Sequence, residues 1–324
     1  MRAIRRVAVI VAGASLAGWG CGAGSGGGSD PGGADAPADV AGDASSDAQG
    51  ACPCICGLPP KTAYRFTEMT CVPPASASKA DADHYTTLCD LLNTIWKRDI
   101  DKGLQSVIYE IEAIHDCSGG GSGSFDVVIG SGGKRKPDGS PCPKAATDTC
   151  DGAFQLQDGY HDPFATALTG CEFESTAKAG GWQLAFHPGN ADDPVLCAPG
   201  VTPPDGILFR QLVSGGRFAT DCATVEAGHL SGCIGKKAAL GLCLCNDLTY
   251  ADCPRAPAAD PATFCNTSCG SSWGMNFGSF VSQVVGIPVN CDMDGNGTLD
   301  DEDGWLIEGT FRAVRVPAAQ YLPW

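Results

Sequence analysis

The chain is poor in aromatic and in basic residues, and both shortages restrict what it can be. Aromatic residues make up only 7 % of its 324 residues, whereas Gly (44) and Cys (19) are abundant. This mixture favours a loop-rich, cross-linked β protein over a helical bundle. Because 21 Lys and Arg stand against 37 Asp and Glu, the formal charge is −16. Nucleic acids and anionic membrane surfaces are therefore disfavoured as partners.

Residues 1–20 have the three parts of an export signal: a basic start (MRAIRR), an apolar stretch (VAVIVAGASLAG) and small residues before Cys21. The apolar stretch is too short for a stable membrane anchor. The segment resembles a bacterial lipoprotein signal, and this resemblance implies lipid attachment at Cys21. Because Gly22 follows the cysteine, the resemblance also implies sorting to the outer membrane, on either its surface or its periplasmic face. The alternative is ordinary cleavage after Ala17, which leaves Cys21 as a free thiol.

The cysteine count agrees with an exported lipoprotein. Lipidation of Cys21 leaves an even number of the 19 cysteines, which can all pair in an oxidising compartment, with a connectivity that the sequence leaves open. Thiolates in CPCIC (52–56) and CLC (243–245) could instead bind zinc, but export favours disulfides. After the anchor, residues 21–50 contain almost only Gly, Ala, Ser, Pro and Asp and predict a disordered tether.

Residues 51–245 predict a disulfide-rich antiparallel β-sandwich or barrel-like domain with one helix. Short apolar runs between Gly, Pro and Asp turns predict strands at 64–71, 104–113, 125–130, 153–157, 165–176, 181–187 and 206–218. The helix is expected at 84–98, where Leu88, Leu91, Leu92 and Ile95 have helical spacing. Residues 246–289 follow as a Cys- and Pro-rich connector.

Alternation in 104–113 predicts one buried face and one wet face. Val107, Tyr109 and Ile111 would be buried, and Glu110 and Glu112 would be exposed. Two carboxylates on one strand face could cleave glycosides. An outward, solvated face is the simpler interpretation.

The sequence DMDGNGTLDDED (292–303) predicts a calcium site, because crowded acidic side chains need a cation among them. Calcium takes six to eight oxygen ligands, and a twelve-residue loop supplies them from positions 1, 3, 5, 7, 9 and 12. Gly297, at position 6, allows the sharp turn. Asp301 and Glu302 would point away from the ion. The predicted ligands are Asp292, Asp294, Asn296, Thr298 (through its carbonyl), Asp300 and Asp303.

This loop resembles a single EF-hand or dockerin-type repeat. The resemblance implies that Leu299 at position 8 pins the loop to a core, and that the loop and a helix over 304–315 form a small module at 290–324. Ile307, Phe311 and Val314 have the helical spacing that this module needs. Pro288 disfavours a full entering helix. The alternative is a solvated acidic turn without an ion.

Catalytic motifs are weak. GSSWG (270–274) matches a nucleophile elbow around Ser272, but it lacks the preceding strand, the following helix and a later histidine. The five histidines are scattered and show no metal-binding spacing.

The whole architecture resembles cysteine-rich outer-membrane lipoproteins of Gram-negative bacteria. We therefore expect a non-enzymatic, calcium-binding lipoprotein whose β domain presents a surface for glycan or another envelope component. A surface polysaccharide hydrolase or lyase and a structural envelope-assembly protein are the alternatives.

Overall fold

The computed structural model describes residues 53–101, 106–117, 122–140, 142, 150–156, 163–175, 184–186, 207–240, 242–245, 250–255 and 274–323. The predicted export signal, Cys21, the tether and Ser272 lie outside these ranges. Asp47–Trp324 forms one compact unit. Among the described residues, no helix combines the length and apolar character needed to cross a bilayer.

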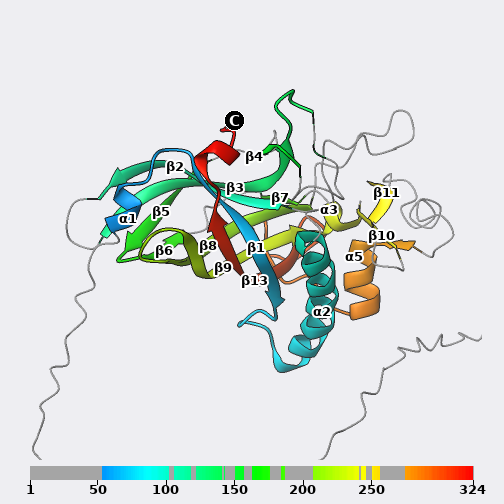
Figure 1. Cartoon of the computed structure of the whole chain (residues 1–324). Coiled ribbons are helices and arrows are strands. Elements are labelled where there is room, and N and C mark those ends of the chain that lie inside the picture. Colours follow the sequence, from blue (N-terminus) through cyan, green and yellow to red (C-terminus); the bar gives the residue numbers. More distant parts are fainter. Residues whose placement is uncertain are drawn as a thin grey trace, which may run out of the picture. The chain divides into compact units, whose positions relative to one another are not determined.

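An antiparallel β-sheet dominates the fold (Figure 1), which confirms the predicted class. Its strands follow the order β2-β1-β13-β9-β8-β6-β5-β3-β4, and β7 pairs with β8. Because β2 pairs with β3 as well as with β1, the sheet curls back towards its first strand, and its sides face each other in a sandwich-like arrangement. The strands are β1 (Thr62–Val72), β2 (Ser106–Asp116), β3 (Ser122–Arg135), β4 (Ala153–Leu156), β5 (Phe164–Thr169), β6 (Glu172–Ser175), β7 (Leu184–Phe186), β8 (Ile207–Phe218), β9 (Thr224–Gly235) and β13 (Gly304–Arg315).

Every predicted strand overlaps an observed one, but β9 and β13 were not predicted as strands. The remaining elements are the three-stranded sheet β11-β10-β12 and short helical segments. Their bounds are α1 (Pro53–Cys56), α3 (Lys236–Leu240), β10 (Leu242–Cys245), β11 (Tyr250–Arg255), β12 (Gly274–Asn276), α5 (Phe277–Ser279), η2 (Phe280–Val285) and η3 (Ala318–Gln320).

The main core lies inside the curled sheet and contains aromatic side chains from strands that are not neighbours. The ring of Tyr64 on β1 lies 5.5 Å from that of Phe218 on β8, and the ring of Tyr109 on β2 lies 5.5 Å from that of Phe173 on β6. All four side chains are buried. Contacts of this kind join the two sides of the sheet, and each buried aromatic side chain adds a large apolar area.

The predicted helix is present and longer than expected, as α2 (Lys79–Asp101). It begins after Ser78, whose hydroxyl accepts a hydrogen bond from the backbone N–H of Asp81 at 3.2 Å. Leu88, Leu92 and Ile95 are buried, so the apolar stripe faces the core as the spacing predicts. Cys89 pairs with Cys71 of β1, against which the helix packs.

The expected helix over 304–315 is wrong. These residues form β13, which pairs with β1 on one side and β9 on the other, in the middle of the main sheet. Burial alternates along it: Trp305, Ile307, Phe311 and Ala313 are buried, while Val314 is 37 % exposed. The backbone groups gain ladder partners on both sides, which an isolated loop-helix module lacks. The C-terminal strand therefore belongs to the sheet and not to a module of its own.

Disulfides cross-link the fold, as the composition predicts. Among the described residues, Cys54 pairs with Cys222, Cys56 with Cys117, Cys71 with Cys89, Cys142 with Cys150, and Cys233 with Cys291. Cys54 and Cys56 of the CPCIC segment thus form disulfides with different partners and do not act as zinc ligands. Pairs far apart in sequence, such as Cys54 and Cys222 with a separation of 168, constrain the unfolded chain most.

Candidate calcium site

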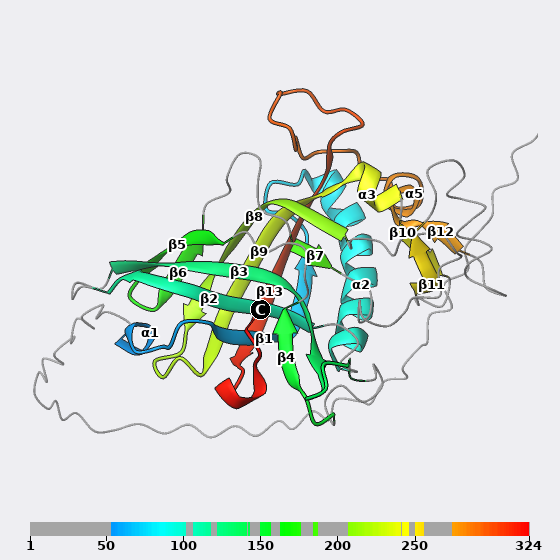
Figure 2. The ribbon, with the colours of Figure 1, turned by 90° about the horizontal axis from the view of Figure 1, so that it is seen from above.

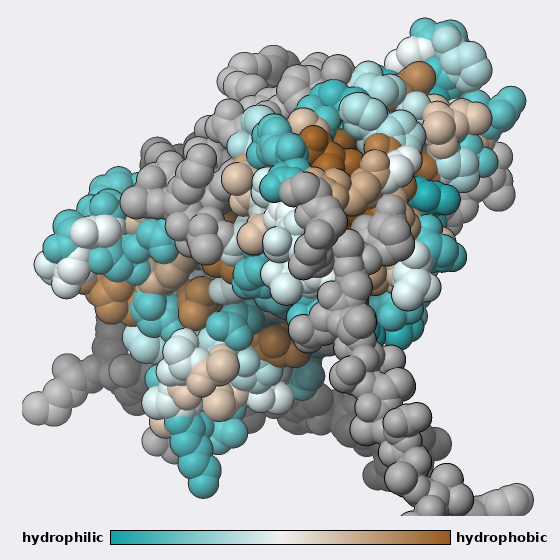
Figure 3. Space-filling view, turned by 90° about the vertical axis from the view of Figure 1, so that its left-hand side faces the viewer, coloured by the Kyte–Doolittle hydropathy of each residue, from teal (hydrophilic) through white to brown (hydrophobic). Residues whose placement is uncertain are grey.

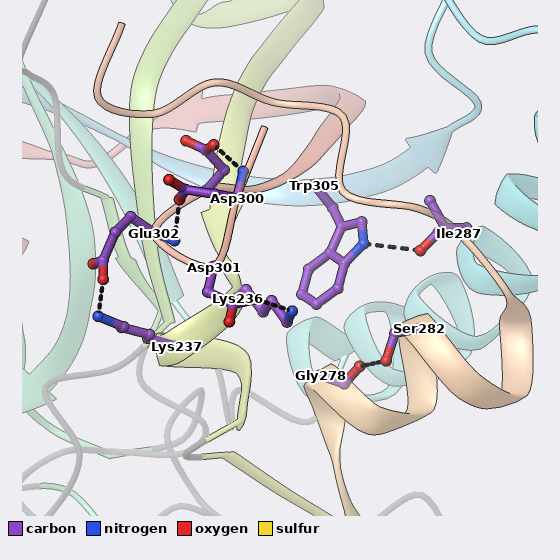
Figure 4. Close-up of polar contacts among 10 residues, drawn as sticks. Lys236, Lys237, Gly278, Ser282, Ile287, Asp300, Asp301, Glu302 and Trp305 are labelled. Carbon is purple, nitrogen blue, oxygen red and sulfur yellow. Dashed lines mark hydrogen bonds and ion pairs between the residues drawn. The ribbon is translucent and has the colours of Figure 1, made fainter. Parts of the chain in front are cut away.

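The acidic loop projects at one end of the sheet, between η2 and β13 (Figure 2). Its base is closed by backbone hydrogen bonds between Cys291 and Gly304, both at 3.1 Å, and by the disulfide from Cys291 to Cys233 of β9. Trp305 follows the loop and donates from its indole N–H to the carbonyl of Ile287, at 3.1 Å (Figure 4). The loop is therefore held at both ends by the rigid part of the fold.

Three of the six predicted ligands come together. One carboxylate oxygen from each of Asp292, Asp294 and Asp303 lies within 4.8 Å of the other two. With calcium–oxygen distances of about 2.3–2.6 Å, two ligand atoms on opposite sides of an ion are about 4.6–5.2 Å apart. The spacing and the all-oxygen donor set therefore fit one calcium ion.

Each of these carboxylates accepts a backbone N–H hydrogen bond, that of Asp294 from Asn296 at 3.0 Å. Asp292 accepts hydrogen bonds from the N–H groups of Gly295 and Gly297, both at 2.7 Å. The N–H of Gly297 is the main cause that lowers the pKa of Asp292, so this group is held in its charged form. Gly297 has a φ of 78°, which agrees with the glycine expected at the sharp turn.

Asp303 is the buried member of the three. It is 0 % exposed, and its two carboxylate oxygens accept the backbone N–H groups of Met293 at 2.7 Å and Asp300 at 2.8 Å. These bonds span the loop from its start to its end. A buried carboxylate costs free energy unless it is paired and hydrogen-bonded, so Asp303 is the most demanding position of the site.

Asp300 is not one of the three converging carboxylates, and Asn296 lies next to Asp294. Asn296 donates from its amide to Asp294 Oδ2 at 2.6 Å and accepts from the N–H of Thr298 at 2.7 Å. Asp300 accepts instead from the N–H of Glu302, at 2.7 Å. In this arrangement these polar groups bond to one another within the loop.

Asp301 and Glu302 point away from the three carboxylates, as expected. Asp301 lies 2.5 Å from Lys236, and Glu302 contacts Lys237, both at the start of α3 (Figure 4). Both acidic side chains are exposed, so these pairs contribute little stability. They link the loop to α3.

The expected role of Leu299 is wrong. Its side chain is 52 % exposed and lies outside the core. The disulfide, the Asp303 hydrogen bonds and the backbone bridge fix the loop instead.

The prediction that Glu110 faces solvent is also wrong, because Glu110 is 0 % exposed. Tyr321, from the C-terminal segment, donates a hydrogen bond to Glu110 Oε2, and Lys61 Nζ lies 3.3 Å from Glu110 Oε1. Lys61 also donates to Glu112 at 2.6 Å. We call Lys61, Glu110, Glu112 and Tyr321 the Glu110 cluster.

Burial raises the pKa of Glu110 to about 6. For Lys61, burial lowers the pKa, but the bonds to Glu112 and Glu110 outweigh it and raise the pKa overall. An apolar patch that joins the C-terminal segment to β1–β4 lies beside this cluster and consists of Ala63, Ile108, Val128, Phe154, Leu156, Val316 and Tyr321. The outer face of β2 is buried because the end of the chain covers it.

Sequence reasoning also missed a pair of side chains on the outside of the sheet. His229 Nε2 lies 2.9 Å from Glu174 Oε2, in a groove of about 430 Å³ that Thr169, Glu172 and Arg217 also line. We call this the outer groove. Its residues come from β5, β6, β8 and β9, so no local spacing could reveal them.

Comparison with protein-family models, curated protein sequences and solved structures gave no match for this chain.

Proposed function

We propose that the protein is an exported, non-enzymatic, calcium-binding outer-membrane lipoprotein that presents its disulfide-linked β domain as a binding surface. Lipidation at Cys21 and the tether would anchor it, and a glycan or an envelope protein would be its partner. The paired cysteines support an oxidising compartment. The observation that carries the proposal is the convergence of Asp292, Asp294 and Asp303, three carboxylates that share one small volume.

Calcium would be bound weakly. Asp at position 12 reaches less far than Glu, which suggests a dissociation constant of about 10⁻⁴–10⁻³ M, the range of extracellular modules. Millimolar calcium would then occupy much of the site. At ten times the dissociation constant, binding adds about 1.4 kcal/mol to the free energy of unfolding.

Thermal unfolding of the exported protein, in detergent, tests calcium binding. We expect the melting temperature to rise with calcium, to rise less or not at all with magnesium, and to return to its starting value with chelator. Asp294→Ala should abolish the rise. Asp301→Ala is the matched control, because Asp301 lies in the same loop but faces Lys236. A variant Asp294→Ala that responds to calcium like the wild type would contradict the site.

A surface polysaccharide hydrolase or lyase is the second candidate, because the outer groove gathers the carboxylates and the imidazole that such chemistry requires. The Glu174 and His229 pair could transfer a proton to or from a bound substrate. Incubation with polysaccharides separates the two functions: a hydrolase releases new reducing ends and a lyase releases unsaturated ends, whereas a binding protein returns the polymer intact.

A further inference from the structure

The outer groove depends on the register of three neighbouring strands. Glu174 of β6 pairs with Gly215 of β8, and Gly215 pairs with His229 of β9. Because adjacent strands are about 4.8 Å apart, side chains on β6 and β9 are normally separated by the residue between them. Glycine has no side chain, so Glu174 and His229 meet above it.

The geometry around Gly215 shows that this meeting needs a glycine. A Cβ atom placed on Gly215 would lie 1.9 Å from Glu174 Oε2 and 2.3 Å from His229 Cε1. Both are side-chain atoms, so a larger residue would push the pair apart without displacing the backbone. Gly215 is thus a position at which the groove can be altered selectively.

A second row of polar side chains runs beside the first. Glu172 of β6 pairs with Arg217 of β8, and Arg217 pairs with Glu226 of β9. Arg217 Nη2 lies 3.6 Å from Glu226 Oε2, and both side chains are about half exposed. Gly216 lies between Gly215 and Arg217 on β8 and faces the other side of the strand, where a Cβ atom would lie 3.1 Å from the buried ring of Phe173.

The surface around β5 and β6 is mixed in character. Figure 3 views the molecule from the side of Figure 1 on which α1, β5 and β6 lie, and hydrophilic side chains border its apolar patches. A ligand that combines polar edges with small apolar faces suits such a surface better than a purely apolar one.

The charges of the groove favour a neutral ligand. Two glutamates and one arginine line it, and Glu226 lies beside that arginine, so the groove has negative character; the whole chain carries −16, and anions are repelled. Glu174 and Glu226 already face His229 and Arg217, which reduces the attraction for a cation. What remains is a set of planar donors and acceptors, namely the carboxylates of Glu172 and Glu174, the guanidinium of Arg217 and the imidazole of His229. Vicinal hydroxyl groups of a sugar match such a set, and the volume lies in the range of small-ligand sites.

We propose that the outer groove binds a neutral glycan, with Glu172, Glu174, Arg217 and His229 as hydrogen-bonding residues. This inference rests on the proposed function, since it names the ligand of the binding surface. It is independent of the calcium loop, which lies on other elements.

The test measures binding of the full-length protein to soluble neutral oligosaccharides (dextran, cellulose and mannan fragments), with polygalacturonate and oligolysine as charged probes. We expect binding to at least one neutral series, by calorimetry or by NMR shifts at His229. Glu174→Gln and Gly215→Ala should each weaken it about tenfold or more. Glu68→Gln, which removes an exposed charge on β1, is the matched control and should bind normally.

Three results would overturn the proposal: no binding to any neutral series, binding that both groove variants retain, or binding to oligolysine or polygalacturonate in place of the neutral glycans. Calcium-dependent unfolding of the same variants is measured in parallel. In the wild type, a normal calcium response without glycan binding refutes the groove alone, whereas Gly215→Ala should lose glycan binding and keep its calcium response. A missing calcium response with groove-dependent glycan binding refutes the calcium site alone.

Discussion

The acidic loop and the Glu110 cluster both hold carboxylates close together, but they do so in opposite ways. In the loop the carboxylates are neighbours in sequence, and backbone N–H groups lower the pKa of Asp292. In the cluster the side chains come from residues 61, 110, 112 and 321, and burial raises the pKa of Glu110 to about 6. A local pattern can therefore be recognised in the sequence. A cluster of residues that are far apart in sequence, such as the Glu110 cluster, is recognised only when the tertiary structure shows which side chains are buried together.

The largest expected effect is a difference in the free energy of unfolding between variants of two predicted ligands of the acidic loop, Asp303 and Asp294. In chelator, Asp303→Ala should lower the free energy of unfolding by about 2–4 kcal/mol, because two backbone N–H groups lose a buried, charged acceptor. Asp294→Ala, at an exposed position, should cost less than about 0.5 kcal/mol under the same conditions. Denaturant titration measures both values. Equal costs would mean that Asp303 has no structural role beyond that of its exposed neighbour.

Removal of Lys61 tests whether the Glu110 cluster depends on its cation. Lys61→Met should cost about 1–3 kcal/mol at pH 7, since it leaves the buried Glu110 without its cationic partner. Lys97→Met is the control and should change stability little, because Lys97 pairs with Asp101 at an exposed site on α2. A cost no greater than that of the control would show that the cluster does not need the charge.

Glu110 should also make stability depend on pH. Its pKa in the folded protein is raised to about 6, above the ordinary 4.5, so the folded state holds this proton more strongly than the unfolded state does. Its contribution is fully present below pH 4.5 and is lost as pH rises through 6. Relative to Glu110→Gln, the wild type should therefore become less stable between pH 4.5 and 7. Urea titrations across this range measure the difference, which Glu68→Gln should not show.

The smallest effect concerns Leu299. Because it is 52 % exposed, Leu299→Ala should change the free energy of unfolding by less than about 0.5 kcal/mol, with or without calcium. A loss of several times that value in calcium alone would mean that the ion draws Leu299 into the core. Differential scanning calorimetry in calcium and in chelator makes this comparison.

Period-two patterns predicted most strands of the main sheet, and the apolar stripe predicted α2. The failure at 304–315 is instructive, because Ile307, Phe311 and Val314 also fit a helix. The same segment contains the alternation of Trp305, Ile307, Phe311 and Ala313, which the strand buries. Short apolar segments can satisfy both periods, and the choice depends on whether neighbouring strands supply hydrogen-bond partners.

The sequence alone determined the antiparallel class, the use of cysteines as cross-links and the position of the acidic loop. Each follows from composition or from residues adjacent along the chain, whose interactions need no knowledge of distant segments. Only the tertiary structure decided that Glu110 is buried under Tyr321, that residues 304–315 form a central strand, and that Glu174 and His229 meet over Gly215. These depend on strand register and chain crossing, which bring together residues far apart in sequence.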